Sequence, residues 1–320
     1  MEELVKELDA LSVDCLHVDC NDNLKVFEDI KYIRTFSKTP IDLHIISSDP
    51  EKFYKGIDET STEMVTFQLE NLKKPLRLPA YIKSKLGIAI VSETPVEAFE
   101  PYKDSFDFIL FMTTTPGKSG GVFNKENFKK IRDFKSKYPG KRIHVDGGVT
   151  GEVAFVLRNM GVHSVVSGSY LVNADETIGK ALHQLRSDSI SSHIRISDFM
   201  ITREELPVIN SAASFLEVLQ SIEKYNFGFA AVTDHGGKLL GIISNADVRR
   251  GLIRNMGRLD SIEVKDILNI NPFKVLSSAT VSEMLAYIKS IKPAILFLPV
   301  VDENNVLLGT VTFNNLIKGE

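Results

Sequence analysis

The sequence lacks the long apolar run that a membrane-spanning helix would need. No hydrophobic stretch in its 320 residues approaches the roughly 18–20 consecutive apolar residues that cross a bilayer. Residues 1–6 are amphipathic, which does not indicate a signal peptide. These absences exclude a membrane partner and lead us to expect a cytoplasmic protein.

An excess of positive charge is also absent, and cysteine is scarce. The 38 Lys and Arg residues are outnumbered by 42 Asp and Glu residues, and the net charge of −4 gives no basis for expecting a nucleic-acid partner. The two cysteines, Cys15 and Cys20, are an odd number of positions apart, which places them on opposite faces of a strand. A disulfide between them is therefore not expected, which suits a reducing compartment.

The length of the chain suggests two domains. In the first of them, strand patterns alternate with helix patterns. Leu4, Val5, Leu8 and Leu11 recur at helical spacing and predict an opening helix. Short apolar segments then alternate with helical patterns, which indicates an α/β fold of the TIM-barrel type. We predict strands at residues 15–20, 42–46, 64–69, 86–91, 106–112, 142–145 and 162–167, and helices at 26–36, 96–102, 125–138, 150–159 and 175–186.

The predicted barrel is short of a strand. A closed (β/α) barrel of this type needs eight strands, each followed by a helix. Because the chain opens with a helix, the missing strand is the first one. An open barrel leaves two strand edges unpaired. We expect the gap to be covered by a partner chain, by another segment of this chain, or by residues outside this sequence.

Three of the predicted strands carry a His and an Asp two positions apart. His17 precedes Asp19, and the same spacing recurs at positions 42 and 44 and at positions 144 and 146. Residues i and i+2 of a strand face the same side, so each pair points together. Gly147 and Gly148 follow the third pair and allow a close approach of the backbone. One His in a strand is more often a core residue, but three such strands favour a site.

These motifs, in this order, resemble ribulose-phosphate 3-epimerase over residues 1 to about 185. The resemblance rests on H-x-D at 17–19, D-x-H at 42–44, M-T-x-x-P-G-x-x-G at 112–120, D-G-G-V at 146–149 and G-S at 168–169. It implies a TIM-barrel enzyme that here lacks its first strand. The family's reaction removes a proton beside a ketone and returns one from the other face, which two carboxylates and a divalent metal can perform.

The resemblance also implies the role of each residue. Asp19 and Asp146 would be the acid–base pair, and His17, Asp19, His44 and Asp146 would bind the metal, with Zn²⁺ preferred and Fe²⁺, Mn²⁺ or Co²⁺ as alternatives. Backbone amides would bind the substrate phosphate at Gly147, Gly148, Gly168 and Ser169, and the substrate loop would include Met112, Gly117 and Gly120. Asp42 and His144 would support these residues or the structure rather than bind metal.

The sequence departs from the family pattern on the substrate side. Asn21 and Ile46 replace methionines of the motifs, and the loop after Gly117 gains Lys118 while losing an aromatic residue and a glutamine. The absent first strand would carry a serine that contacts substrate. The metal-binding positions are kept, so these changes bear on which sugar phosphate is the substrate.

The character of the sequence changes after Arg186. Residues 187–193 are polar and serine-rich, as in a linker. An internal repeat follows, in which residues 196–200 are echoed by 264–268, 212–222 by 279–288 and 229–247 by 296–315. We predict domains at residues 1–186 and 194–320, with repeats at about 194–256 and 257–320.

The repeats resemble a CBS-domain pair, or Bateman module, and are similar to the pair at the end of arabinose-5-phosphate isomerases. The resemblance implies an α+β fold that commonly binds adenine or other nucleotides. Its G-h-h-[ST]-x-x-D signature is matched by Gly241, Ser244 and Asp247 and in part by Thr312, while Asn315 replaces the second aspartate. Since many CBS pairs only dimerise, nucleotide binding stays open, whereas pairing of CBS modules between chains leads us to expect a homo-oligomer.

Two functions follow from these patterns. The first is a metal-dependent ketose-phosphate 3-epimerase that works through an enediolate and is regulated by nucleotide at the CBS pair. The kinship with a sugar-phosphate isomerase module suggests the synthesis of cell-surface carbohydrate precursors. The alternative is a non-catalytic sensor of a phosphosugar or nucleotide. Asp19 and Asp146 favour the enzyme, and the lost strand and altered loop favour the sensor.

Overall fold

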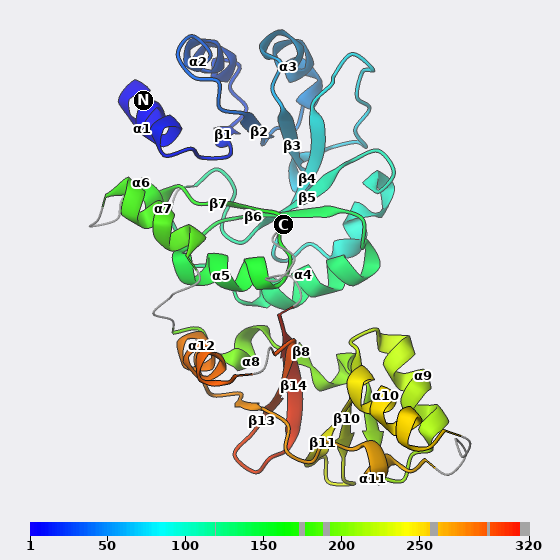
Figure 1. The fold of residues 1–320 in the computed structure, drawn as a ribbon. Helices are drawn as coiled ribbons and strands as arrows, with labels where there is room; N and C mark the ends of the chain where they lie inside the picture. Colours follow the sequence, from blue (N-terminus) through cyan, green and yellow to red (C-terminus); the bar gives the residue numbers. More distant parts are fainter. Residues whose placement is uncertain (119, 173–176, 188–192, 257–261, 293–294, 314–320) are drawn as a thin grey trace. The chain divides into compact units, whose positions relative to one another are not determined.

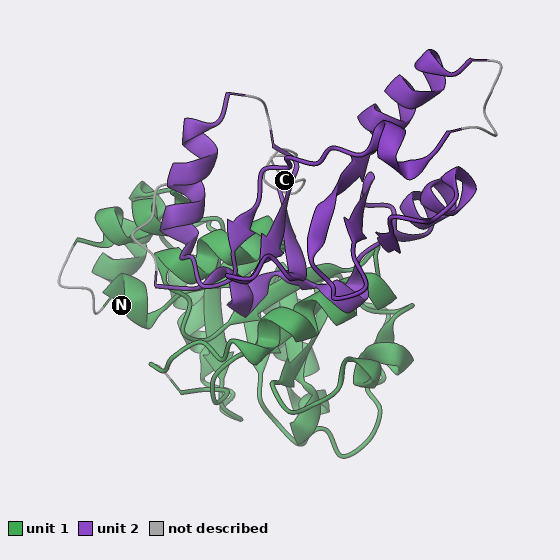
Figure 2. Cartoon of the chain, turned by 90° about the horizontal axis from the view of Figure 1, so that it is seen from below, with its two compact units in different colours: residues 1–190, 320 green, residues 191–319 purple. Residues whose placement is uncertain are grey.

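The chain forms two compact units, residues 1–190 and 191–319 (Figure 2). This computed structural model describes residues 1–118, 120–172, 177–187, 193–256, 262–292 and 295–313. The predicted linker lies outside the described residues apart from its two ends. Within the described parts of the chain, no helix is long and apolar enough to cross a membrane.

The first unit is a nearly closed parallel barrel, as the sequence predicts (Figure 1). Its strands follow one another in sequence order around one seven-stranded sheet. Each of the seven predicted strands is confirmed, with ends that shift by up to two residues. They are β1 (Leu16–Cys20), β2 (Ile41–Ile45), β3 (Met64–Gln68), β4 (Lys85–Val91), β5 (Phe108–Met112), β6 (Arg142–Asp146) and β7 (Ser164–Val166).

Helices connect these strands and cover the outside of the barrel. The α-helices are α1 (Glu2–Ala10), α2 (Val26–Ile33), α3 (Tyr54–Thr60), α4 (Glu126–Lys137), α5 (Gly151–Asn159), α6 (Ser169–Val172) and α7 (Ile178–Arg186), and the 3₁₀ turns are η1 (Pro50–Phe53), η2 (Leu69–Asn71) and η3 (Val96–Tyr102). The helical stretch predicted at 96–102 is present as the 3₁₀ helix η3, and Pro101 within it cannot donate the backbone hydrogen bond of an α-helix. The start of the helix predicted at 175–186 lies outside the described residues.

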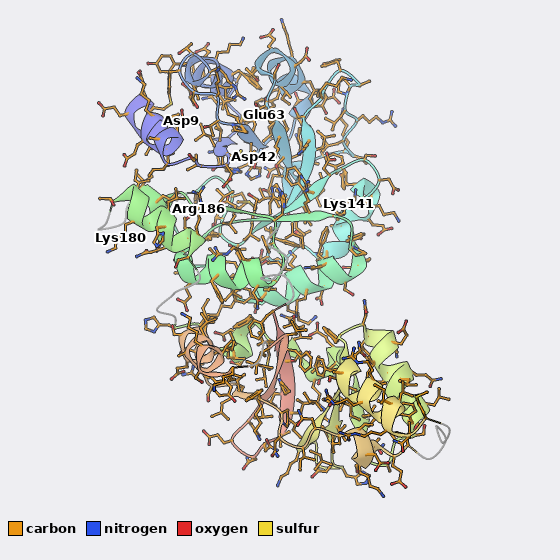
Figure 3. All side chains as sticks on the ribbon, viewed as in Figure 1. Asp9, Asp42, Glu63, Lys141, Lys180 and Arg186 are labelled. Atoms are coloured by element: carbon orange, nitrogen blue, oxygen red, sulfur yellow. The ribbon has the colours of Figure 1, made fainter. Side chains whose placement is uncertain are left out.

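The predicted gap lies between β1 and β7. Among the described residues, β1 pairs only with β2 and β7 only with β6. Helix α1 lies on the outside, where the helix after a first strand belongs (Figure 1). It is held from one side by Thr39, which donates to Asp9, and from the other by Arg186, which donates to the carbonyl of Ser12 at the end of the helix. Figure 3 marks Asp9 and Arg186 on these neighbouring elements.

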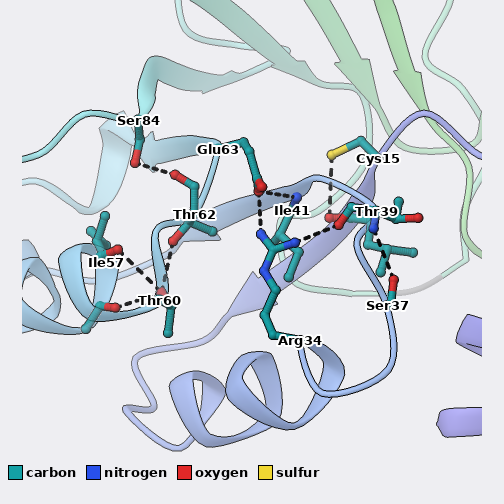
Figure 4. A network of polar contacts seen from close by, with 12 residues as sticks. Cys15, Arg34, Ser37, Thr39, Ile41, Ile57, Thr60, Thr62, Glu63 and Ser84 are labelled. Atoms are coloured by element: carbon teal, nitrogen blue, oxygen red, sulfur yellow. Dashed lines mark hydrogen bonds and ion pairs between the residues drawn. The ribbon is translucent and has the colours of Figure 1, made fainter.

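A polar network fixes the amino-terminal ends of β2 and β3 (Figure 4). The carboxylate of Glu63 accepts hydrogen bonds from the guanidinium of Arg34 and from the backbone N–H of Ile41, the latter at 2.8 Å. Ser84 donates to the carbonyl of Thr62 at 2.6 Å and extends the network toward β4. The starts of three neighbouring strands are therefore held in register.

The barrel interior is packed on the side opposite the gap. Phe108 lies over Gly87, where an added Cβ would collide with the ring. Ala89 and Leu110 are fully buried beside it. The ring of His144 stacks on Phe108 with a centroid distance of 4.1 Å. Apolar packing therefore fills the β4–β6 side of the barrel interior.

The second unit is the predicted α+β CBS pair. It contains two small sheets, with strand orders β11-β10-β9 and β12-β13-β14-β8. Its strands are β8 (Ile201–Thr202), β9 (Val208–Asn210), β10 (Phe229–Thr233), β11 (Leu239–Ser244), β12 (Val275–Leu276), β13 (Phe297–Val301) and β14 (Leu307–Thr312). Its helices are α8 (Ile196–Phe199), η4 (Arg203–Glu205), α9 (Phe215–Tyr225), α10 (Asn245–Arg254), α11 (Val264–Ile267) and α12 (Val281–Ser290).

The two repeats have matching strand registers. Phe229 pairs with Ser244 in the first sheet, and Phe297 pairs with Thr312 in the second. Each ladder has one irregularity near the same end of the pair. The two phenylalanine rings stack with a centroid distance of 4.0 Å, which joins the two sheets. The signature positions Ser244 and Thr312 are therefore equivalent in structure as well as in sequence.

Candidate active site

Three strands place the four predicted metal-binding side chains in the barrel interior. His17 and Asp19 lie on β1, His44 on β2 and Asp146 at the end of β6. Asp19 is in register with His44, so their side chains are neighbours on the inner face. Asp146 comes from the far side of the gap.

The distances bring these groups to one point. Nε2 of His17 lies 3.5 Å from Oδ1 of Asp19 and 3.8 Å from Oδ2 of Asp146. Nδ1 of His44 lies 3.1 Å from the same Oδ1 of Asp19. The ligand atoms of His17, Asp19 and His44 all lie within 4.8 Å of one another, which suits a metal ion. Asp146 approaches this group through its contact with His17.

The outer nitrogen of each imidazole is held by a second side chain. Nδ1 of His17 lies 3.0 Å from Oδ2 of Asp42, and Nε2 of His44 lies 2.9 Å from Oε1 of Gln68. With the outer nitrogen held in this way, the inner nitrogen of each ring, Nε2 of His17 and Nδ1 of His44, is turned toward Asp19. Asp42 therefore has the supporting position that the sequence predicted. The contact of Gln68 with His44 was not predicted, because the sequence around Gln68 contains no motif.

The group fits a divalent metal. Nε2 of His17 is buried and has no hydrogen-bond partner among the described residues, although it faces two carboxylates. A buried polar atom without a partner is costly. Two imidazoles and two carboxylates form a donor set that suits Zn²⁺ and also Fe²⁺, Mn²⁺ and Co²⁺.

The two candidate acid–base carboxylates have pKa values shifted in opposite directions. Burial raises the pKa of Asp19, but the neighbouring imidazoles of His17 and His44 outweigh burial and lower the pKa below its usual range. Burial is the main influence on Asp146 and raises its pKa, with a further increase from the charge of Asp19. Two carboxyl groups with separated pKa values are suited to act as base and acid.

His17 is held in its charged form when no metal is bound. Burial lowers its pKa, but the carboxylates of Asp19 and Asp42 outweigh burial and raise the pKa to about 10. A metal ion must therefore displace a proton from His17 in order to bind. This competition makes metal binding dependent on pH.

His144 does not join this group, although it lies on the same strand as Asp146. Its ring stacks on Phe108 and lies 5.7 Å, centroid to centroid, from His163. Burial is the main influence on His144 and lowers its pKa to about 4, so the ring is neutral. The sequence left a structural and a supporting role for His144 open. Its ring contacts with Phe108 and His163 favour the structural role.

The glycine pair after β6 is required by the loop that follows β5. Thr113 donates its backbone N–H to the carbonyl of Asp146 at 2.8 Å. Gly147 and Gly148 have φ values of +111° and +62°, and an added Cβ would collide with Thr114 at Gly147 and with the backbone nitrogen of Phe123 at Gly148. The pair therefore lets the loop after β5 pack closely against the end of β6.

One cavity of about 1350 Å³ connects the predicted site residues. Among the site residues predicted in the barrel, His44 does not line this cavity. The predicted residues that line it are His17, Asp19, Met112, Gly117, Gly120, Asp146, Gly147, Gly148, Gly168 and Ser169. An added Cβ at Gly168 meets no atom within 4 Å, so this backbone is open to a ligand.

Two of the CBS signature residues, Ser244 and Asp247, cap the amino-terminal end of helix α10. Ser244 Oγ accepts the N–H of Asp247 at 3.3 Å, and the Asp247 carboxylate accepts the N–H of Ser244 at 2.9 Å. This capping box gives both residues a structural role. Asp247 also pairs with Arg250. A second cavity of about 400 Å³ is lined by Asp247, Arg250, Gly251 and Arg254 with residues 266–269. Asn315 lies outside the described residues.

The chain is similar to known proteins in both units. Residues 1–172 match the model of the Ribulose-phosphate 3 epimerase family, and residues 196–254 and 264–319 match the model of the CBS domain. A ribulose-phosphate 3-epimerase of Helicobacter pylori (strain J99) is 30% identical over 187 residues, which cover 54% of this chain and 86% of the relative. The Bacillus subtilis enzyme of the same name is 26% identical over 196 residues, 57% of this chain and 90% of the relative.

A solved structure is similar to the second unit. The CBS domain-containing protein of Bacillus anthracis (Ames Ancestor) is 20% identical and covers 40% of this chain and 92% of its own, with a TM-score of 0.36. The second unit is a CBS pair by its family match. Because the family model spans residues 1–172 of the 320, the chain belongs to the ribulose-phosphate 3-epimerase family.

Proposed function

We propose that the barrel is a metal-dependent 3-epimerase of a ketose phosphate. The observation that carries this proposal is the approach of Asp19 and Asp146, with oppositely shifted pKa values, to the same nitrogen of His17. Family membership supplies the reaction class. His17, Asp19, His44 and Asp146 would hold the metal, which when bound would stabilise negative charge on the substrate oxygens.

The residues divide the proton transfers between them. Asp19, the carboxylate with the lowered pKa, is ionised and takes the proton from C3 on one face of the substrate. Asp146, whose pKa is raised, is the better suited of the two carboxyl groups to carry a proton and would return one on the other face. The backbone at Gly168 and Ser169 is open and would bind the phosphate. The loop seated on Gly147 and Gly148 would shield the enediolate from water.

Solvent hydrogen exchange tests the reaction directly. Ribulose 5-phosphate and other ketose phosphates are incubated with the protein in D₂O, with Zn²⁺, Mn²⁺, Fe²⁺ and Co²⁺ in parallel, and deuterium at C3 is measured by NMR. Asp19→Asn and Asp146→Asn should each reduce incorporation by about 10²-fold or more. Asp133→Asn, on the exposed face of α4, should leave it unchanged. No incorporation from any ketose phosphate would refute the epimerase.

The open side of the barrel favours a second candidate, a sensor that binds a phosphosugar without turnover. The gap between β1 and β7 joins the site to a large cavity, which weakens the exclusion of water that enediolate chemistry needs. A sensor should show a rise in Tm with ketose phosphate but no deuterium at C3. Asp146→Asn should then leave the thermal shift in place.

We propose further that the CBS pair binds an adenine nucleotide and regulates the barrel, and that it pairs between chains. The cavity beside α10 supports an anionic ligand, because Arg250 and Arg254 line it. AMP and ATP are titrated by calorimetry, and the deuterium rate is measured with each. Arg254→Met should weaken binding, and sedimentation tests the oligomer. An unchanged rate at saturating nucleotide would remove the regulation.

A further inference from the structure

A chain of hydrogen bonds leads from the candidate metal site to the end of β3. Nδ1 of His44 lies 3.1 Å from Oδ1 of Asp19, and Nε2 of the same ring lies 2.9 Å from Oε1 of Gln68. Nε2 of Gln68 in turn donates to Oε2 of Glu70 at 2.5 Å. His44 and Gln68 are buried, whereas Glu70 is exposed just after β3. The chain therefore joins a carboxylate at the surface to a candidate metal ligand in the barrel interior.

The carboxylate of Glu70 is held by the loop that follows β4. Its Oε1 accepts the backbone N–H of Val91 at 3.0 Å and the hydroxyl of Thr94 at 2.5 Å. The loop that supplies these donors is itself held by Lys130, which donates to the carbonyl of Val91 at 2.5 Å. Both oxygens of Glu70 are therefore engaged as acceptors, one toward the loop and one toward Gln68.

A carboxylate can only accept, and this decides which way the carboxamide of Gln68 lies. The NH₂ group of Gln68 faces Glu70, so its carboxamide oxygen faces His44. A longer contact of 3.5 Å, from Nε2 of Gln68 to the carbonyl of Ala89, favours the same orientation. The bond to Glu70 is the stronger of the two, because it is shorter and hydrogen bonds to a carboxylate are about twice as strong as neutral ones.

The orientation of Gln68 decides which nitrogen of His44 is left for a metal ion. An oxygen that faces Nε2 requires a hydrogen on that nitrogen, whether the ring is neutral or charged. Nδ1, which faces Asp19, is then the nitrogen that can coordinate. With an NH₂ group facing Nε2 instead, the neutral ring would carry its hydrogen on Nδ1, where it would block coordination. One orientation of the carboxamide therefore permits metal binding and the other opposes it.

We propose that Glu70 is a positioning residue for the metal site and acts through Gln68 and His44. Glu70 does not line the cavity that contains the site. Its contribution is to hold the carboxamide of Gln68 in the orientation that leaves Nδ1 of His44 available. The inference rests on the proposed metal site, but it concerns the protein before metal and substrate bind, so it can be tested without either.

Glu70→Gln should reverse the chain with almost no change in shape. The N–H of Val91 can only donate, so the oxygen of the new carboxamide stays with it and the new NH₂ group faces Gln68. Gln68 then turns its own oxygen to that group and its NH₂ group to His44. Nε2 of His44 becomes an acceptor, and the hydrogen of the neutral ring moves to Nδ1.

NMR of the full-length, metal-free protein with ¹⁵N-labelled histidine reads this hydrogen directly. Ring nitrogens with and without a hydrogen have well-separated ¹⁵N shifts, and the spectrum of His44→Gln, which lacks one ring, assigns the signals. Nε2 of His44 should carry a hydrogen in the wild type and none in Glu70→Gln. Glu93→Gln makes the same chemical change at an exposed position of the loop after β4 and should leave the ring as in the wild type.

Exchanging the two side chains tests whether Glu70 acts through position 68. In the double variant Gln68→Glu with Glu70→Gln, the carboxylate at position 68 accepts from both Nε2 of His44 and the new NH₂ group. Every bond of the chain is then restored at the same net charge. Competition with a chromophoric chelator should show that Zn²⁺ affinity falls about 10-fold in Glu70→Gln and largely returns in the double variant. A second substitution would not repair a loss of packing.

The outcomes separate this role from a structural one. An Nε2 of His44 without hydrogen in the wild type would overturn the proposal. So would a wild-type ring and affinity in Glu70→Gln, a loss of affinity without a change in the ring, or a double variant that binds Zn²⁺ no better than Glu70→Gln. If Glu70→Gln does not fold, the wild-type ring and the double variant still decide. Absence of deuterium exchange in every ketose phosphate would refute the epimerase and leave these measurements unaffected.

Discussion

Nδ1 of His17 lies 3.0 Å from Oδ2 of Asp42, and this contact decides which nitrogen of the ring faces the site. Asp42 is only 4% exposed. Burial raises the pKa of its carboxyl group, but the hydrogen bond with His17 outweighs burial and lowers it. Asp42 therefore stays ionised, accepts the N–H at Nδ1 and turns Nε2 toward Asp19 and Asp146.

Removing this acceptor should weaken metal binding without removing a ligand. Asp42→Leu leaves the N–H of His17 without a partner and lets the ring turn, so Zn²⁺ affinity should fall by about 10- to 100-fold. Asp42→Asn keeps an acceptor, so its Zn²⁺ affinity should fall less. Competition with a chromophoric chelator at pH 7 measures both. Asp133→Leu on exposed α4 is the matched control, and an unchanged affinity in Asp42→Leu would contradict the role.

Gln68 should act on His44 in the same manner. Its Oε1 lies 2.9 Å from Nε2 of His44, which turns Nδ1 toward Asp19. Gln68→Leu removes the acceptor and should weaken Zn²⁺ binding by about 10-fold, whereas Gln68→Glu retains an acceptor and should restore most of it. If both variants bind metal equally weakly, packing rather than the hydrogen bond explains the loss.

The sequence predicts which candidate ligand side chains come together because strands have a period of two. His17 and Asp19 must share a face once β1 is a strand, and parallel register then brings His44 beside Asp19. Both steps depend on local pattern and fold class alone. The glycines after Asp146 were also identified, but their packing against the loop at Phe123 is a tertiary contact.

The sequence could not predict partners that depend on packing between strands. Gln68 ends β3 without any motif around it, and its role follows only from its position next to His44 across the sheet. His144 shares a face with Asp146 in the sequence pattern, yet it lies one layer away and stacks on Phe108. The 3₁₀ geometry around Pro101 likewise depends on hydrogen bonds that apolar spacing does not report.

Gly148→Ala should destabilise the barrel strongly. The residue has a φ of +62°, and an added Cβ would collide with the backbone nitrogen of Phe123, which cannot rotate away. Left-handed backbone and overpacking together should cost about 2–4 kcal/mol in the free energy of unfolding. Urea denaturation followed by circular dichroism measures this. Gly140→Ala is the control, since its added Cβ meets no atom within 4 Å, and an equal loss in both variants would contradict the packing role.

Lys130 should give the barrel a stability that rises with pH. Burial lowers its pKa from 10.5 to about 8, despite the nearby charges of Glu70 and Glu93. Between these two values the unfolded chain binds the proton and the folded chain does not, so the free energy of unfolding increases with pH in that window. Below about pH 8 the cost of burying the charge is fully present.

The variant Lys130→Met removes this titration. Between pH 8 and 10.5 the free energy of unfolding of the wild type should rise by about 1–2 kcal/mol relative to that of Lys130→Met. This figure includes a discount for the half-exposed side chain. Denaturation curves of both proteins across this range measure the difference. Lys129→Met, at an exposed position of the same helix, controls for the loss of a lysine. Parallel curves for wild type and Lys130→Met would contradict the assignment.

Ser244 should combine a capping role with nucleotide binding, and a second cap separates the two. Ser244 caps α10, and Thr280 caps α12 with the same reciprocal bonds to the residue three positions later. Ser244→Ala and Thr280→Ala should therefore each cost about 1 kcal/mol in stability. Only Ser244 belongs to the signature, so only its variant should weaken AMP or ATP binding in calorimetry. If both variants bind nucleotide as tightly as the wild type, Ser244 acts as a helix cap alone. Its variant would then have lost stability without losing nucleotide affinity.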